Sequence, residues 1–246
     1  SAGRLLVVQG TPGHASIPYG ARSAAYRVGD VLQQLGAVVP AVELGELWDA
    51  FVSARISDAD LAERLRDPVR LDAALPHLGG IAGYAYAVSR VTISPTVLRA
   101  GSTHNVIPGS GSIELDIRTL PGTSDDDVDD LLRAVLGPLS DEVEIQHLRG
   151  WKATASGTDT PLFAAIERAV EAVAGSSVVP IMAAGGSDAR LFRELGVPAY
   201  GYGLLGPSWS YERYREGVHG HDERIDIESV ELSLEALRLI VADRIS

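Results

Sequence analysis

Hydrophobic positions in the first 150 residues recur with two different periods. Stretches in which apolar and polar residues alternate predict strands, and stretches with apolar residues three or four apart predict amphipathic helices. In chain order the predicted elements are a strand at 5–9, a helix at 23–35, strands at 91–97 and 113–118, a helix at 124–136 and a strand at 143–146. This β-α-β-β-α-β order is typical of a ferredoxin-like unit, in which helices cover one face of a four-stranded antiparallel sheet.

A less regular stretch, residues 38–88, interrupts this unit. Leucines recur there near helical spacing, and prolines break the stretch into short pieces. The leucines are Leu61, Leu65, Leu71 and Leu75, and the prolines are Pro40, Pro68 and Pro76. We therefore expect a helical insert, and we assign residues 4–150, with the insert, to the first domain.

The pattern changes after Gly150. Helices are predicted from Thr160 to Gly175, at about 188–195 and at about 229–245, and short buried strands at 178–182 and 199–202. The last helix carries four apolar residues on one face, Val230, Leu234, Leu237 and Val241. Two strands are too few for a complete α/β domain, so residues 151–246 are expected to complete a sheet whose other strands lie elsewhere. The predicted fold class is α/β, with an α+β first domain.

Composition narrows the classes of partner. Lys and Arg number 21 against 33 Asp and Glu, and the net charge of −12 disfavours nucleic acid and anionic membranes. No apolar run reaches the roughly 18 residues that cross a bilayer. The chain has no cysteine, so a metal would have to be held by histidines and carboxylates. The absence of disulfides suits the cytoplasm, which is the expected location.

A histidine in a restrained loop is the first candidate for chemistry. His14 lies in the run 10–18, Gly-Thr-Pro-Gly-His-Ala-Ser-Ile-Pro, directly after the first strand. Glycine and proline on both sides restrict the backbone, so the imidazole is expected to be presented from a defined turn. A single histidine near a strand end is also common as an ordinary surface residue, and this residue alone leaves both interpretations open.

Two further residues suit the binding of a carbonyl or a carboxylate. Asn105 lies in the connection between the two central strands, where its amide either hydrogen-bonds a ligand or only forms a turn. Arg118 ends the strand 113–118 and shares its polar face with Glu114 and Asp116. It is therefore either part of a surface ion pair or a bidentate clamp for a carboxylate.

Two loops of the second segment also carry candidate residues. The run 185–190, Gly-Gly-Ser-Asp-Ala-Arg, opens a helix, where backbone N–H groups can bind an anion or a developing oxyanion. It falls one glycine short of the G-x-S-x-G nucleophile elbow. The run 219–223, His-Gly-His-Asp-Glu, places two histidines two residues apart, which indicates a loop or an extended segment. It is either a metal site or a polar loop.

Five motifs together resemble those of the M20 family of metallopeptidases, the group of acetylornithine deacetylase, succinyl-diaminopimelate desuccinylase, aminoacylase-1 and glutamate carboxypeptidase. They are G-x-x-G-H-A-S-x-P at 10–18, N-V-I-P at 105–108, D-I-R-x-x-P-G at 116–122, G-G-S-D-A-R at 185–190 and H-x-x-D-E at 219–223. Their order and spacing match the family too. The resemblance implies that residues 4–150 are a lid or dimerisation domain and that residues 151–246 are the C-terminal part of a zinc-binding catalytic domain.

The resemblance also implies roles for the residues of the first domain. His14 would reach across a dimer interface and stabilise a tetrahedral oxyanion in the partner's active site. Asn105 and Arg118 would hold the carboxylate of the substrate. The protein would therefore be a homodimer that forms through its lid domain.

For the second segment, the resemblance implies a metal centre and a substrate pocket. Gly186 and Ser187 would line the pocket, His219 would be a zinc ligand, and His221 would lie behind the ligand or in the pocket. The implied reaction is hydrolysis of an amide or peptide bond, in an N-acyl amino acid or small peptide, by a metal-activated water. Two Zn²⁺ ions per complete site are implied, and sites of this kind also accept Co²⁺ or Mn²⁺.

The chain departs from the family in its metal ligands. The H-x-D and Glu-Glu motifs, which the N-terminal part of the family's catalytic domain supplies, occur nowhere in the sequence. Because each zinc needs three or four ligands, we expect this chain alone to be inactive and to be part of a larger enzyme, as the missing initiator Met also indicates. The alternatives are a non-catalytic chain that dimerises or binds carboxylates, and a serine hydrolase that uses Ser187.

Overall fold

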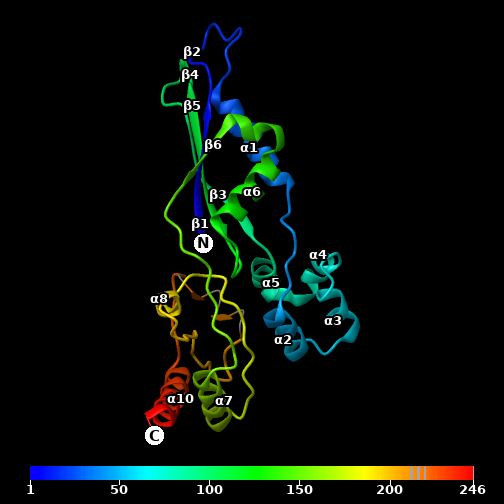
Figure 1. Ribbon diagram of the computed structural model, residues 1–246, viewed down its shortest axis with the longest axis vertical. Helices are drawn as coiled ribbons and strands as arrows, with labels where there is room; N and C mark the ends of the chain where they lie inside the picture. Colours follow the sequence, from blue (N-terminus) through cyan, green and yellow to red (C-terminus); the bar gives the residue numbers. More distant parts are fainter. Residues whose placement is uncertain (211–212, 215–216, 219, 246) are drawn as a thin grey trace. The chain divides into compact units, whose positions relative to one another are not determined.

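The computed structural model describes residues 1–245 with the exception of 211–212, 215–216 and 219 (Figure 1). The chain forms two compact units, and each unit is built from two separate segments. Unit 1 comprises residues 1–41 and 90–153, and unit 2 comprises residues 42–89 and 154–246. The helical insert, which the sequence analysis assigns to the first domain, is thus grouped with the C-terminal segment.

Unit 1 is built on a four-stranded antiparallel sheet with the strand order β3-β5-β1-β6. The strands are β1 (Ala2–Gln9), β3 (Thr92–Ala100), β5 (Ser110–Arg118) and β6 (Val143–His147), and the helices are α1 (Ala24–Ala37) and α6 (Asp125–Leu136). Both helices lie on the same face of the sheet (Figure 1). The predicted β-α-β-β-α-β order is confirmed, and β5 and β1 are its central strands.

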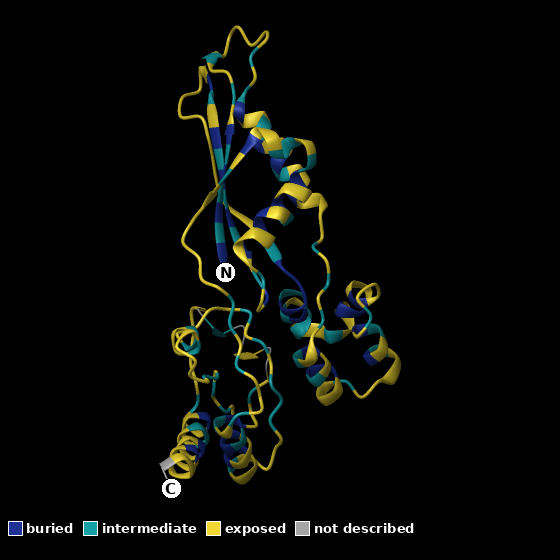
Figure 2. Ribbon diagram, in the orientation of Figure 1, coloured by how far each residue is buried: buried dark blue, intermediate teal, exposed yellow. Residues whose placement is uncertain are grey.

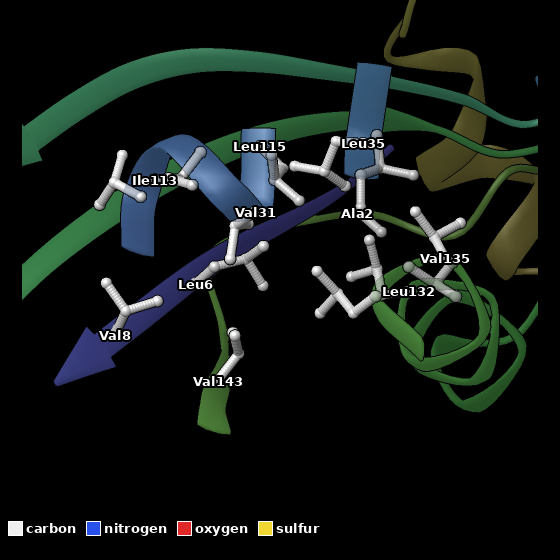
Figure 3. Packing of buried hydrophobic residues seen from close by; sticks show 14 of the residues in the cluster. Ala2, Leu6, Val8, Val31, Leu35, Ile113, Leu115, Leu132, Val135 and Val143 are labelled. Carbon is white, nitrogen blue, oxygen red and sulfur yellow. The ribbon is translucent and has the colours of Figure 1, made fainter. Parts of the chain in front are cut away.

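The core of unit 1 lies between the sheet and the two helices (Figure 3). Alternate residues of the strands point into it, among them Leu6 of β1 and Ile113 and Leu115 of β5. Val31 of α1 and Leu132 of α6 close the core from the helix side, and all five side chains are at most 2% exposed. Burial of each such side chain stabilises the fold by about 1.5–3 kcal/mol. The alternating pattern therefore decides which face of the sheet the helices cover.

Local sequence signals begin and end the helices of unit 1. Ser23 caps α1, and Ser124 and Asp127 form a reciprocal capping box at the start of α6. Gly137 follows α6 with a φ of 54°, a conformation that favours glycine. One helix end differs from the prediction: α1 continues two residues beyond the predicted end at residue 35, because Gly36 keeps a helical backbone.

A buried arginine on β1 attaches the sheet to α6. Arg4 lies on the same face as Leu6, and its side chain is 1% exposed. Its Nε donates to Oδ1 of Asp129 at 2.7 Å and its Nη2 donates to Asp125 at 2.8 Å, while Nε2 of His147 lies 2.8 Å from the other oxygen of Asp129. Burial acts to raise the pKa of Asp129, but hydrogen bonds and charge from Arg4 and His147 outweigh it and lower that pKa.

Short helical pieces make up residues 42–89 of unit 2. They are α2 (Glu46–Arg55), α3 (Ala59–Leu65), α4 (Leu71–Ala74), the 3-10 helix η1 (Leu75–Ile81) and α5 (Ala82–Val88). Their apolar faces bury a common cluster, in which the indole of Trp48 donates to the carbonyl of Leu65 at 2.8 Å. Met182 packs against this cluster, and the Tyr84 hydroxyl donates to its carbonyl at 2.7 Å. These contacts are why the insert belongs with the C-terminal segment.

The C-terminal segment contains helices but not the two predicted strands. Its helices include α7 (Pro161–Ala174), α8 (Ala189–Glu194) and α10 (Ile227–Ile245). Residues 178–182 and 199–202 have no strand partner among the described residues. Side chains bond their backbone instead: the Ala199 carbonyl accepts from the Arg193 guanidinium at 2.6 Å, and the Ala199 N–H donates to Ser156 Oγ at 3.1 Å. A strand requires backbone partners, so the apolar pattern alone does not produce one.

The apolar face of α10 is exposed, and a different face is buried (Figure 2). The residues of the predicted stripe, Val230, Leu234, Leu237 and Val241, are 48–56% exposed. The inward face carries the buried Ser229, Ala236 and Ile240 and the half-buried Ser233. The hydroxyls of Ser229 and Ser233 accept from the N–H groups of Gly206 and Leu204 at 2.8 Å each. These contacts orient the serine face of α10 inward.

Among the helices of the described residues, none combines the length and apolarity needed to cross a membrane.

Asp226, directly before α10, makes the stability of this region depend on pH. Its Oδ1 accepts from the Ser229 N–H at 2.7 Å, and its Oδ2 accepts from the Trp209 indole and the Ser208 hydroxyl. These hydrogen bonds, those of Ser229 first, lower the pKa of Asp226 to about 2. A lowered pKa means that the contribution to stability is complete above the ordinary carboxyl pKa of 3.8 and is lost as the pH falls toward about 2.

We expect Asp226→Asn to flatten the acid side of the stability profile. Between pH 4 and 2 the free energy of unfolding of the wild type should fall more steeply than that of the variant. Urea unfolding, followed by tryptophan fluorescence at a series of pH values, measures both slopes. Asp222→Asn, on an exposed turn, is the matched control and should keep the wild-type slope. Equal slopes for the wild type and Asp226→Asn would contradict the expectation.

Candidate functional site

A short two-stranded ladder positions His14. Strand β2 (Gly13–His14) pairs with β4 (Val106–Ile107), so that His14 lies opposite Val106. The ladder continues beyond the strands, because the Ala15 N–H donates to the Asn105 carbonyl at 2.9 Å. The structure thus brings two predicted site residues, His14 and Asn105, to the same end of unit 1 (Figure 1).

Glycine makes the base of this ladder compact. The Gly10 N–H donates to the Gly109 carbonyl at 2.8 Å, and the Thr11 N–H donates to the Arg22 carbonyl at 2.7 Å. A Cβ atom at Gly10 would lie 2.3 Å from the Arg22 carbonyl oxygen. Only glycine lets the chain entering the loop and the chain leaving it approach this closely. Gly10 therefore fixes the base of the loop from which the imidazole projects.

The imidazole of His14 is exposed and contacts Ser16, a residue that the sequence analysis did not single out. The Ser16 N–H donates to Nδ1 of His14 at 3.2 Å, and Ser16 Oγ lies 2.6 Å from the same nitrogen. The sequence feature that could have predicted this contact is a hydroxyl residue two positions after the histidine, in a loop with proline at position 18. Tyr19, just beyond, is 98% exposed, so this loop presents its side chains to the outside of unit 1.

Asn105 occupies a turn, and its side chain is exposed. The Val106 N–H donates to the Thr103 carbonyl at 3.3 Å, which closes the turn directly before β4. Asn105 therefore lies in a turn, as expected if its role is only to form one. Its exposed amide remains a candidate for ligand binding, next to His14.

Arg118 lies at the other end of β5 from this ladder. Eight residue steps at about 3.3 Å each place it about 26 Å from Ser110, where β5 begins. Its Nη2 donates to Asp116 Oδ2 at 2.7 Å, and the two side chains are 44% and 41% exposed. Arg118 is thus in a surface ion pair, and a single copy of unit 1 does not bring it to Asn105.

The glycine run of unit 2 precedes a very short helix. Gly185, Gly186 and Ser187 are exposed, and the six-residue helix α8 begins at Ala189. A Cβ atom at Gly185 or Gly186 would meet no atom within 4 Å. Nothing in the described part of the chain therefore requires glycine at these two positions.

The described residues do not form a metal site. They contain no group of three or more His, Cys, Asp or Glu side chains that suits a metal ion. His219, the predicted zinc ligand, lies outside the described residues, and His221 is exposed on the turn at 221–222. The residues that are described therefore do not fit a complete zinc centre.

Comparison with known proteins identifies the family. The family model described as peptidase family M20/M25/M40 matches residues 16–243. A LysW-lysine/LysW-ornithine hydrolase of Pyrobaculum aerophilum is 28% identical over 167 residues, which cover 65% of this chain and 42% of the relative. The M20 family metallo-carboxypeptidase Sso-CP2 of Sulfolobus solfataricus has a similar fold, with a TM-score of 0.63 and 16% identity over 98% of this chain and 58% of the other.

A second solved structure also has a similar fold. The di-peptidase Dug1p of Saccharomyces cerevisiae matches with a TM-score of 0.60 and 16% identity, over 98% of this chain and 53% of its own. The chain spans about half the length of these relatives. The family model covers most of the chain, and the five motifs lie in the expected order. The chain therefore belongs to peptidase family M20/M25/M40.

Proposed function

We propose that this chain is the lid domain and the C-terminal part of the catalytic domain of a metal-dependent hydrolase. Its substrate would be an N-acyl amino acid or a small peptide, cleaved at an amide or peptide bond. Membership of the M20/M25/M40 family supports the reaction class. The observation that carries the proposal is the ladder of β2 and β4, which holds His14 and Asn105 side by side at one end of unit 1.

The chain's own residues would bind and orient the substrate. Nε2 of His14 would donate a hydrogen bond to the oxygen that becomes negative during attack on the carbonyl. The amide of Asn105 and the guanidinium of Arg118 would hold the substrate carboxylate, since a planar guanidinium pairs well with a carboxylate. Gly186 and Ser187, both exposed in the structure, would line the pocket.

The proposal requires metal ligands that the described residues do not provide. His219 is one candidate, and the remaining ligands would come from polypeptide beyond this chain. Zn²⁺ is the expected ion, and Co²⁺ or Mn²⁺ also suits histidine and carboxylate ligands. Because the described residues do not fit a complete centre, no catalytic step is assigned to the metal.

The geometry of unit 1 favours a homodimer in this proposal. One copy presents His14 and Asn105 at one end of the sheet and Arg118 at the other. A small substrate can meet all three only if Arg118 comes from a different copy than the other two. Strand β3 lies at an edge of the sheet, and an unpaired edge is suited to pairing with a second chain. The lid domain is therefore the proposed dimer interface.

The test is metal-dependent turnover in a polypeptide that joins this chain to a complete set of metal ligands. We expect that polypeptide to hydrolyse N-acyl amino acids or dipeptides, to lose activity with a chelator and to regain it with Zn²⁺, Co²⁺ or Mn²⁺. The chain by itself should show no turnover. Chelator-resistant hydrolysis that Ser187→Ala abolishes would instead identify a serine hydrolase. Carboxylate binding without any turnover in the longer polypeptide would identify a binding protein.

A further inference from the structure

The turn that follows His14 folds back onto its own imidazole. The Ile17 N–H donates to the His14 carbonyl at 2.9 Å, which closes a tight turn over residues 14–17. Ser16 lies inside this turn, and both of its polar groups meet Nδ1 of His14, the N–H at 3.2 Å and Oγ at 2.6 Å. One ring nitrogen is therefore occupied within the loop, and the other, Nε2, is left for a ligand.

The contact with the Ser16 backbone decides which ring nitrogen carries the proton. A backbone N–H can only donate, so Nδ1 must accept and must be unprotonated. A neutral imidazole has one N–H, which is then on Nε2. In this form Nε2 donates a hydrogen bond, and its lone pair is part of the aromatic ring and is not available in the ring plane. It suits an oxygen that gains negative charge, and it suits neither a metal ion nor proton abstraction.

We propose that Ser16 is the positioning residue of His14, which fixes the Nε2–H form and orients the ring. The Oγ contact is the shorter of the two, and hydroxyl contacts near 2.7 Å are strong whereas N–H contacts of 3.2 Å are at the long limit. The hydroxyl is therefore the stronger of the two Ser16 contacts. The consequence for catalysis rests on the proposed function, whereas the tautomer itself does not.

Nitrogen-15 NMR of the histidine rings tests the assignment directly on this chain. At about pH 9, where imidazoles are ordinarily neutral, Nδ1 of His14 should resonate as an acceptor and Nε2 as a protonated nitrogen. Ser16→Ala keeps the backbone N–H and should leave Nε2–H as the main form, but loss of the hydroxyl donor should lower the ratio of the Nε2–H form to the Nδ1–H form by about three- to tenfold, the effect of one lost hydrogen bond. Ser16→Thr, which keeps a hydroxyl, should restore the wild-type signals. The control is Ser94→Ala on the exposed strand β3.

The rings of His77 and His104 serve as internal references and should be the same in every variant. The proposal is overturned if wild-type His14 is protonated on Nδ1, or if Ser16→Ala leaves its signals unchanged. Turnover of the longer polypeptide separates this proposal from the proposed function. If Ser16→Ala shifts the tautomer as expected but His14→Ala has full activity, Ser16 is confirmed as the positioning residue and the catalytic role of His14 is wrong.

Discussion

Replacement of His14 by alanine should lower kcat of the longer polypeptide by about 10²–10³-fold, the usual cost of losing one donor to a developing oxyanion. Arg118→Ala should lower kcat/KM by about 10–100-fold, because in our proposal its guanidinium is a charged hydrogen-bond partner of the substrate. His104→Ala is the matched control for the first change. His104 is also exposed, in the loop just before Asn105, and its replacement should leave activity unchanged.

Mixing the two impaired variants, His14→Ala and Arg118→Ala, tests whether the site is shared between copies. In our proposal one copy supplies His14 and the other supplies Arg118, so a dimer of His14→Ala with Arg118→Ala contains one intact site. After equal mixing and random exchange of subunits, about a quarter of the wild-type activity should return. Activity that stays at the mean of the two separate variants would mean that His14 and Arg118 do not meet in a site shared between copies. That outcome would contradict the proposed dimer while leaving the hydrolase assignment open to its own test.

Replacement of Asp129 by alanine should destabilise unit 1 by about 3 kcal/mol, since it removes a partner from a buried charge. The Arg4 side chain is 1% exposed, and without Asp129 its charged partner would be Asp125, whose side chain is 54% exposed; its hydrogen bonds to the carbonyls of Gly3 and Asp125 would remain. Urea unfolding of the chain measures the loss. The control is Asp130→Ala, because Asp130 pairs with Arg133 on the exposed side of the same helix, and such pairs contribute about 0–1 kcal/mol.

A double replacement separates pairing from burial. Arg4→Met with Asp129→Leu removes both charges and keeps apolar volume, so it should recover most of the stability that Asp129→Ala loses. If the double variant is as unstable as Asp129→Ala, the loss of stability comes from the packing of the Asp129 side chain and not from its charge pairing with Arg4. Equal stability of Asp129→Ala and Asp130→Ala would also contradict the expectation.

The sequence by itself determined the elements that depend on local chemistry. Alternating residues predicted β3 and β5, and apolar periodicity predicted the helices that the structure places directly after Ser23, Ser124 and Thr160, each of which caps its helix. Gly175, in the left-handed conformation, ends α7 as expected. The turn that presents His14 could be predicted from the sequence, because glycine and proline restrict the backbone within a few residues of their own positions.

The tertiary structure decided what depends on residues far apart in the chain. It placed Arg4 in the core, because Asp129, 125 residues later, neutralises it there. It turned the apolar stripe of α10 outward, since the hydroxyls of Ser229 and Ser233 find backbone partners only on the opposite face. It also left 178–182 without strand partners among the described residues. The spacing of apolar residues along the chain indicates which side chains share a face of a helix or strand. Whether that face is buried depends on the residues that the fold packs against it.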